Sequence, residues 1–365
     1  MLKEAFQELS PRILERYRSF LGRSLPADPK LRSLHELYSE YTCRDINFPR
    51  PILTFFGRFH REERVSFDSL DEIGPPLFIS QILRDFLAIH DDIVDEDIIK
   101  FDKPALPVLY STDEMGPLSY LSANLSKQGK DLALYYGDLL VGMIYKTLEG
   151  APQASMNELL KLVNDTIMLN QTGQLRELLL QKKDIKSLDV DEIVQIYVLK
   201  ASYYCYSFPF EVGLALSGAS KALQEKSRSL LLRLGAASQI VDDVVGVFPD
   251  LFNHGKDTVG ELIHLRRTIP LILLSKKLVS GDEILEILNH TVAISNDEAK
   301  RIKIEMYKRG ILEETAALMK KTVQGLPGEI ETLPVGSATK EYLKDLLESR
   351  VMANAQKFIG VANAN

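Results

Sequence analysis

The stretch FLAIHDDIVDEDIIKFDKP, residues 86–104, decides the fold. It ends an apolar segment with a run of carboxylates, in which Asp91 and Asp95 lie four residues apart and share one helical face. Asp92 is offset from that face by about a hundred degrees. A solvated helix end is the ordinary interpretation of such a run, but here the carboxylates crowd a helix C-terminus, where the helix dipole disfavours negative charge. A hard divalent cation such as Mg²⁺ would offset the clustered charge, because it takes oxygen ligands.

A second stretch, QIVDDVVGVFPDLFNHGK at residues 239–256, repeats the pattern. Asp242 and Asp243 follow another apolar helix, and Lys256 adds a cation that could meet an anion. Two acidic helical segments in one bundle can face each other across a cavity and hold several Mg²⁺ ions on one diphosphate. The two stretches together therefore predict a helical bundle with a metal–diphosphate site.

Helical spacing extends outward from both stretches to almost the whole chain. Apolar residues recur with the period of an α-helix, and sustained alternation typical of strands is hard to find. Helix starts are indicated at residues 155–158 and 189–192, where Ser or Asp is followed three residues later by Glu. No repeat or linker marks a second domain. The sequence predicts an all-α fold, a single large bundle of residues 1–365 around a central hydrophobic cavity, with residues 1–40 as an N-terminal helical extension.

Composition narrows the class of function. Hydrophobic residues make up 45% of the 365 residues and charged residues 26%, which is typical of a chain that forms a core. The net charge of −7 argues against a nucleic-acid binder but not against a small phosphorylated ligand. Cys43 and Cys205 have no metal-ligand or redox spacing, so we expect reduced thiols and a cytoplasmic protein. No apolar run is long enough for a transmembrane segment.

The ordered motifs resemble the trans-isoprenyl diphosphate synthase (polyprenyl synthetase) family. The family's first signature, Asp-Asp-x-x-Asp followed by Arg-Arg-Gly-x-Pro, is matched by DDIVDEDIIKFDKP, with Pro104 at the family spacing. Its second, Gln-x-x-Asp-Asp-x-x-Asp followed by Gly-Lys, is matched by residues 239–256. The resemblance runs from about residue 40 to the C-terminal helices. Smaller matches follow in the family's order: Arg50-Pro51-x-Leu53, Gly137-Asp138, Gly173-Gln174, Lys200 and Arg266-x-Thr268-x-Pro270.

The resemblance implies a nearly complete site for an allylic diphosphate. In the family this subsite uses metal ions, three Mg²⁺ with the bound diphosphate, together with basic residues. Lys100 stands for the first arginine of the Arg-Arg pair, and Gly246 removes one carboxylate. The implied metal ligands are Asp91, Asp92, Asp95, Asp242 and Asp243, which with Lys200 are the implied catalytic residues; Lys100, Lys200, Lys256 and Gln239 are the implied diphosphate ligands.

The neighbouring subsite, which in the family binds isopentenyl diphosphate, is altered. The family uses a lysine, an arginine, a histidine and the second arginine; the matching positions here are Asn47, Arg50, Arg84 and Phe101. Only Arg50 is kept, and Arg84 supplies a charge where a histidine is expected. The loss of two cations would remove charge-assisted contacts worth about 1.5–3 kcal/mol each.

Two bulky residues before the first motif, Phe86 and Leu87, resemble those that shorten the prenyl-chain pocket in short-chain members of the family. Ordinary core packing is the alternative interpretation for both side chains.

The resemblance implies a Mg²⁺-dependent prenyltransferase that ionises an allylic prenyl diphosphate and condenses it with isopentenyl diphosphate to give a short-chain trans-prenyl diphosphate. It also implies a homodimer. Asn47, Phe101 and Gly246 leave a second hypothesis open, a terpene cyclase-like enzyme or a prenyltransferase with another acceptor. A third is an inactive subunit that partners an active synthase.

Overall fold

The apolar segment before the first acidic run forms helix α4 (Ile79–Val94), and in the computed structural model it is a core helix. Residues 79–89 are all buried, so this helix is enclosed on every side rather than amphipathic. Each fully buried leucine, isoleucine or phenylalanine stabilises the fold by about 1.5–3 kcal/mol. The helix is capped by Asp95, and Glu96 then takes a left-handed φ of 55°. The acidic run therefore crosses the end of the helix.

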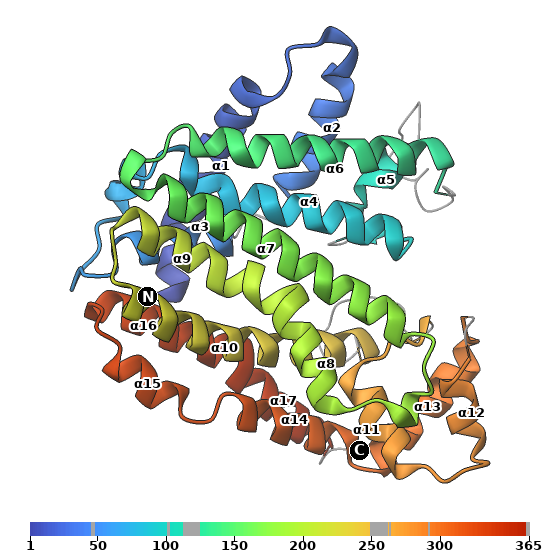
Figure 1. Cartoon of the computed structure of the whole chain (residues 1–365). Coiled ribbons are helices and arrows are strands. Elements are labelled where there is room, and N and C mark those ends of the chain that lie inside the picture. Colours follow the sequence, from blue (N-terminus) through green and yellow to red (C-terminus); the bar gives the residue numbers. More distant parts are fainter. Residues whose placement is uncertain are drawn as a thin grey trace. The chain divides into compact units, whose positions relative to one another are not determined.

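The structure describes residues 1–44, 48–100, 103–111, 125–248, 262, 264–290 and 293–362. Among these residues the only strands are β1 (Ile99–Lys100) and β2 (Lys103–Pro104), which form a short antiparallel pair. All other regular structure in this part of the chain is helical (Figure 1). The predicted all-α class is confirmed.

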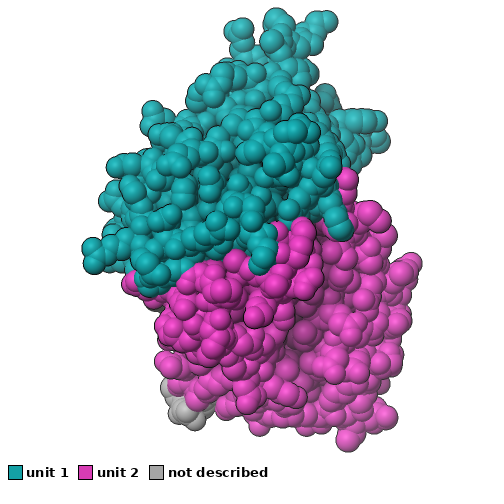
Figure 2. Space-filling view, turned by 60° about the vertical axis from the view of Figure 1, so that its left-hand side comes forward, with its two compact units in different colours: residues 1–163, 208–220, 336–339 teal, residues 164–207, 221–335, 340–365 magenta. Residues whose placement is uncertain are grey.

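The chain divides into two compact units, coloured teal and magenta in Figure 2. Unit 1 comprises residues 1–163, 208–220 and 336–339, and unit 2 comprises residues 164–207, 221–335 and 340–365. The first acidic motif belongs to unit 1 and the second to unit 2. The single domain and the central hydrophobic cavity that the sequence analysis expects stay predictions.

Unit 1 brings helices together where glycine replaces a side chain. A Cβ added at Gly57 would lie 2.3 Å from the Phe210 carbonyl oxygen, and one at Gly213 would lie 2.2 Å from that of Thr54. Helices α3 and α9 therefore touch backbone to backbone. The elements of unit 1 are α1 (Leu2–Ser24), α2 (Arg32–Thr42), α3 (Pro49–Arg58), α4, β1, β2, α5 (Leu106–Leu109), α6 (Lys127–Leu148), the first part of α7 (Gln153–Leu180) and α9 (Phe208–Leu216), with 3₁₀ turns at Pro29–Leu31, Phe67–Glu72 and Pro75–Phe78.

Unit 2 is built on the long helix α10 (Lys221–Val247). It packs against a π-helical stretch, Val198–Ser207, through Gly235, where an added Cβ would lie 2.6 Å from the Ser202 Cβ. The other elements of unit 2 are the remainder of α7, a 3₁₀ turn (Ile185–Ser187), α8 (Val190–Tyr197), α11 (Ile269–Lys277), α12 (Glu283–Leu288), α13 (Asn296–Lys308), α14 (Ile311–Thr322), α15 (Leu326–Thr332), most of α16 (Ser337–Leu347), a second π-helical turn (Glu348–Met352) and α17 (Ala353–Ala362).

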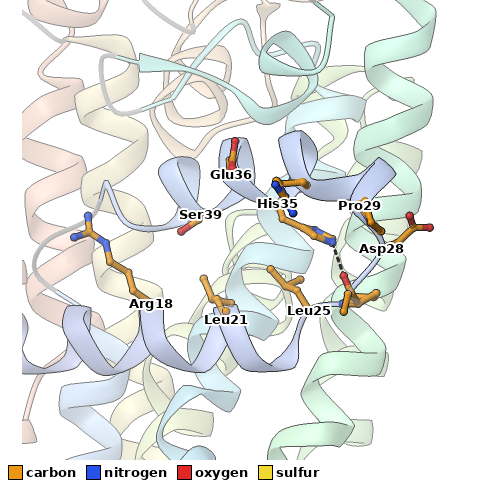
Figure 3. Close-up of a pocket in the computed structure, with 12 residues that line it drawn as sticks. Arg18, Leu21, Leu25, Asp28, Pro29, His35, Glu36 and Ser39 are labelled. Carbon is orange, nitrogen blue, oxygen red and sulfur yellow. Dashed lines mark hydrogen bonds between the residues drawn. The ribbon is translucent and has the colours of Figure 1, made fainter.

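The N-terminal helices belong to the core of unit 1. Leu9, Ile13 and Tyr17 of α1 have no exposed surface. A surface pocket of about 380 Å³ lies between α1 and α2, and His35 of α2 bonds across it to the carbonyl oxygen of Pro26 at 3.1 Å (Figure 3). None of the predicted site residues lines this pocket.

The structure also bears on the two cysteines and on membrane-spanning helices. Neither Cys43 nor Cys205 is in a disulfide bond. None of the helices in the described part of the chain has the length and apolarity that a membrane crossing requires.

Candidate active site

The second aspartate of the first motif points into unit 1. Asp92 has no exposed surface; its Oδ1 accepts a hydrogen bond from Lys100 Nζ at 2.5 Å, and its Oδ2 accepts one from the Tyr41 hydroxyl at 3.1 Å. Burial raises the pKa of Asp92, and the charge of Lys100 opposes that rise. Burial by itself would lower the pKa of Lys100, but the charges of Asp92 and Asp91 raise it overall. The two residues thus form a largely buried ion pair.

The other two aspartates of this motif lie at the more open side of the helix end. Asp91 and Asp95 are half-buried, and the Asp95 backbone N–H bonds to the Asp91 carbonyl oxygen at 2.8 Å. Because this is the last helical turn, the two side chains keep the i, i+4 spacing that places them on one face. This face can offer two carboxylates to a cation.

The second motif, on α10 in unit 2, has the same design. Asp242 is exposed, whereas Asp243 is buried and its Oδ2 accepts hydrogen bonds from the Tyr197 hydroxyl and, at 3.2 Å, from the Ile269 backbone N–H. Ile269 is the first residue of α11, so Asp243 satisfies one of the amide groups that a helix N-terminus leaves unpaired. Burial raises the pKa of Asp243 to about 7, against the hydrogen bonds that lower it.

Lys200 lies near this second motif, on the π-helical stretch. Its ammonium pairs with Glu177 of α7, and its backbone carbonyl oxygen accepts a hydrogen bond from Asn170 Nδ2 at 2.5 Å. Gly173 makes the approach of α7 possible, because an added Cβ would lie 2.8 Å from the Lys200 backbone nitrogen. The charge of Lys200 also lowers the pKa of Asp243, so the ammonium lies within electrostatic reach of the second motif.

The two residues predicted for the acceptor subsite both lie in unit 1. Arg50 is half-buried in the first turn of α3, and Arg84 lies in the buried part of α4 with 5% of its surface exposed. The Arg84 guanidinium donates a hydrogen bond to Asp85 Oδ1 at 3.0 Å. Among the other predicted positions, Gln239 is half-buried on α10. The positions Asn47, Phe101 and Lys256 lie outside the described residues.

The two residues proposed to set chain length are buried in unit 1. Phe86 is 6% exposed and Leu87 is 5% exposed, and the Phe86 ring meets the His90 ring at a centroid distance of 4.7 Å. His90 in turn lies with its Nε2 3.4 Å from Asp138 Oδ1 of α6. Gly137 lets α6 come this close, since an added Cβ would lie 2.8 Å from the His90 ring.

Residues 63–308 of the chain match a family of known proteins that is described as polyprenyl synthetase. This match covers more than half of the chain. The chain belongs to the polyprenyl synthetase family. The family assignment made from the two acidic motifs is therefore confirmed, and the chain is a prenyltransferase of the isoprenyl diphosphate synthase class.

Individual members of the polyprenyl synthetase family are distant relatives of this chain. A geranylfarnesyl diphosphate synthase of Aeropyrum pernix is 23% identical over 269 residues, which cover 72% of this chain and 77% of the relative. A geranylgeranyl diphosphate synthase of Saccharolobus solfataricus is 24% identical over 270 residues, which cover 72% and 74%. A crystal structure of geranylgeranyl pyrophosphate synthase from Corynebacterium glutamicum, complexed with isoprenyl diphosphate and magnesium, superimposes with a TM-score of 0.79 at 17% identity, covering 94% of this chain and 98% of the other. This likeness confirms the isoprenoid synthase fold.

The more open carboxylates of the two acidic motifs have the chemistry that a magnesium ion takes. Carboxylate oxygens are the donors that a hard cation takes, and Mg²⁺ is commonly held by one or two carboxylates together with water and substrate phosphates. In the described part of the chain no three histidine, cysteine or acidic side chains are arranged to hold a metal on their own. Asp91 and Asp95 of unit 1 and Asp242 of unit 2 each offer a carboxylate of this kind.

The residues that hold the buried side chains of the two motifs are not part of either motif. Tyr41 and Tyr197 lie 51 and 46 positions away from the aspartates to which they donate, so no local motif connects them. Glu177 had a weak signal, because it follows the Gly173-Gln174 match on the same face of α7. These side chains hold two aspartates and one lysine in place, which a bare motif does not reveal.

Proposed function

We propose that this polyprenyl synthetase ionises an allylic prenyl diphosphate and transfers the prenyl group to isopentenyl diphosphate, giving a short-chain trans-prenyl diphosphate. The observation that supports the proposal is the shared design of the two acidic motifs. Each buries its second aspartate against a tyrosine, while the first aspartate lies nearer the surface. The relatives described above are synthases of geranylfarnesyl and geranylgeranyl diphosphate, which supports a substrate of the same class.

The five aspartates would have two kinds of role at the metal ions. Asp91, Asp95 and Asp242 would coordinate Mg²⁺, three ions in all with the bound diphosphate, while Asp92 and Asp243 would complete the site from their hydrogen-bonded positions. Bound Mg²⁺ supplies electrostatic stabilisation of the departing diphosphate. The Corynebacterium glutamicum crystal structure is complexed with isoprenyl diphosphate and magnesium, which supports a role for magnesium in this protein.

The lysines would bind the diphosphate oxygens directly. Lys200 is paired with Glu177 and Lys100 with Asp92, so both ammonium groups are already placed beside carboxylates of the site. An incoming diphosphate offers stronger charge-assisted hydrogen bonds than a single carboxylate and would compete for these ammonium groups. Lys256 and Gln239 would add to this set. Arg50 and Arg84 would hold the diphosphate of the acceptor.

Loss of the open aspartates tests the proposal. Purified protein with Mg²⁺ is given dimethylallyl, geranyl or farnesyl diphosphate, with and without isopentenyl diphosphate, and the products are identified by mass spectrometry. We expect longer prenyl diphosphates that require isopentenyl diphosphate. Asp91→Asn and Asp242→Asn should each lower kcat by about 100-fold or more, the effect of losing one electrostatic stabiliser of a transition state. Both variants should melt like the wild type, because neither side chain is in the core.

A matched control and the contrary outcomes complete the experiment. Asp131→Asn removes an aspartate on α6 that pairs with Lys127 at the surface, and should leave turnover unchanged. Hydrocarbons or alcohols formed without isopentenyl diphosphate would favour the terpene cyclase alternative. A wild-type protein without turnover would favour the inactive partner subunit. Near-normal rates in Asp91→Asn or Asp242→Asn would refute metal-assisted ionisation at these residues.

The assembly and location of the protein also stay predictions. We expect a homodimer, which light scattering coupled to size-exclusion chromatography measures directly. We expect a cytoplasmic location from the two free thiols, which cell fractionation would test.

A further inference from the structure

One buried carboxylate of unit 1 has no part in the site described above. Asp85 lies on α4 directly after Arg84 and has no exposed surface. A charge taken out of water is costly unless hydrogen bonds and an opposite charge compensate for it. The groups that compensate for the Asp85 charge should therefore indicate the role of Asp85.

The two oxygens of Asp85 receive hydrogen bonds from two different sources. Oδ2 accepts from three hydroxyl groups of the N-terminal helices: Tyr17 at 3.1 Å, Tyr38 at 2.9 Å, and Thr42. Oδ1 accepts from α4 itself: Gln81 Nε2 at 3.2 Å and Arg84 NH1 at 3.0 Å. The carboxylate thus joins α1 and α2 on one side to the Arg84 guanidinium on the other.

The hydroxyl donors of this cluster are held firmly. The Tyr17 ring packs at a tilt against Phe78 with a centroid distance of 5.2 Å, and the Tyr38 ring packs in the same way against Tyr136 at 4.9 Å. Burial raises the pKa of Tyr17 and of Tyr38 well above the ordinary value, so both stay protonated and donate. Rings and hydroxyl groups together fix the carboxylate, and the carboxylate fixes the guanidinium.

Arg84 is also aligned with the first acidic motif along α4. It lies seven residues before Asp91, which is about two helical turns, so the two side chains share one face of the helix. The guanidinium therefore lies on the side of α4 that carries the first aspartate of the motif. A cation at this point is suited to a second, neighbouring anion.

We propose that Asp85 is a positioning residue: together with Tyr17, Tyr38 and Thr42 it holds the Arg84 guanidinium in place for the diphosphate of the acceptor substrate. This inference rests on the proposed function, in which Arg84 binds isopentenyl diphosphate. It assigns a part in acceptor affinity to the N-terminal helices α1 and α2, both of which lie before the family match at residues 63–308. A guanidinium that is oriented in advance loses less freedom on binding, and so binds a diphosphate more tightly.

The experiment separates acceptor affinity from allylic affinity. Thr42→Val and Tyr38→Phe each remove one donor from Asp85 without changing a charge, and Asp85→Asn removes the charge itself. We expect each variant to raise KM for isopentenyl diphosphate. The rise should be about tenfold for Asp85→Asn, because this factor corresponds to the binding free energy of one ordinary hydrogen bond. KM for the allylic diphosphate should stay within about twofold, a change too small to count as a lost hydrogen bond.

Tyr110→Phe is the matched control, because Tyr110 donates to the Leu34 carbonyl oxygen of the same helix α2 at 3.0 Å without touching Asp85.

A double-mutant cycle tests whether Asp85 acts through Arg84. If it does, Thr42→Val and Asp85→Asn should raise the acceptor KM in the wild-type background but have no further effect in an Arg84→Gln background. Equal effects in both backgrounds, or equal rises in both KM values, would mean that the cluster only stabilises the fold.

A binding measurement separates failure of this inference from failure of the proposed function. Titration calorimetry with isopentenyl diphosphate follows binding without turnover. If the wild type binds and elongates but the variants bind equally well, only the positioning role of Asp85 is wrong. If the wild type neither binds nor elongates isopentenyl diphosphate, the proposed function and this inference fall together. Asp85→Asn is interpreted only if its circular dichroism matches the wild type; Thr42→Val and Tyr38→Phe decide the question otherwise.

Discussion

The side chains that matter most at the residue scale are the two buried aspartates, Asp92 and Asp243. The sequence placed both within metal motifs, but it could not show that each is turned inward and held by a tyrosine, because those contacts connect distant positions. Partners of this kind become visible only in three dimensions, since they depend on how helices pack. Burial of a carboxylate is tolerated here because hydrogen bonds replace the lost water.

Removing the tyrosine hydroxyls should destabilise the protein. Tyr41→Phe and Tyr197→Phe each leave a buried carboxylate with one donor fewer, at a cost of about 1–3 kcal/mol in the free energy of unfolding. Urea denaturation followed by circular dichroism measures this cost. Tyr135→Phe is the control, since Tyr135 is 73% exposed and its loss should change stability by less than about 0.5 kcal/mol. Equal stability of all three variants would show that the hydroxyl groups do not support the aspartates.

Phe86 should limit the length of the product. Phe86→Ala creates space before the first acidic motif, so longer prenyl diphosphates should appear in the product distribution measured by mass spectrometry. Phe20→Ala, which removes an equally buried ring from α1, controls for general loss of packing and should not lengthen the product. An unchanged product distribution in Phe86→Ala would mean that Phe86 only packs in the core and does not limit product length.

At the scale of helices, the type of element was easier to predict than its ends. Asp189 caps α8 as predicted, its side chain accepting a hydrogen bond from the Asp191 backbone N–H at 3.1 Å. The helix start predicted at Ser155 is wrong: α7 begins at Gln153, and the Ser155 hydroxyl donates instead to the Ala215 carbonyl oxygen at 2.9 Å. Ser155 is buried against α9, and its hydroxyl group pairs with a carbonyl oxygen there instead of capping the helix, because a buried hydroxyl group needs a hydrogen-bond partner.

Close approach between helices should make one glycine irreplaceable. Gly173→Ala would bring a Cβ to 2.8 Å from the Lys200 backbone nitrogen, so α7 and the π-helical stretch must separate. Overpacking of this kind costs about 1–3 kcal/mol of stability, and it should also lower kcat by displacing Lys200. Thermal denaturation and steady-state kinetics measure the two effects.

Gly142 offers the matched control for this prediction. It lies inside α6 with no atom within 4 Å of an added Cβ. Gly142→Ala should therefore raise stability by up to about 1 kcal/mol, since alanine favours a helix over glycine. A Gly173→Ala variant that behaves like Gly142→Ala would show that the approach of α7 is not tight.

At the scale of the molecule, the all-α class and the family followed from the sequence, while the division into two units did not. Helical periodicity repeats along the chain whatever the units are, so it carries no information on where they separate. The N-terminal helices contribute to the core of unit 1. Leu9, Ile13 and Tyr17 are fully buried in unit 1, although the family match begins only at residue 63.

Deleting residues 2–44 should therefore prevent unit 1 from folding. The deletion removes three hydroxyl donors from Asp85 and uncovers the face of α3 that packs against α1. We expect loss of cooperative unfolding and binding of a hydrophobic dye. A full-length chain with Arg32→Ala and Glu36→Ala, two exposed residues of the same segment, should unfold like the wild type. A truncated protein that unfolds cooperatively near the wild-type temperature would contradict this expectation.

The π-helical stretch Val198–Ser207 has a consequence for the evolution of this enzyme. A π-helix bonds each residue to the fifth one along rather than the fourth, so it holds more residues per turn than an α-helix. Loss of a single codon between Tyr197 and Lys200 would let the stretch relax toward an α-helix and swing the lysine around the axis relative to the tyrosine. A point substitution changes one position of this stretch at a time. A change in its length would instead move the Tyr197 hydroxyl and the Lys200 ammonium, the two groups that act on Asp243, relative to each other in one step.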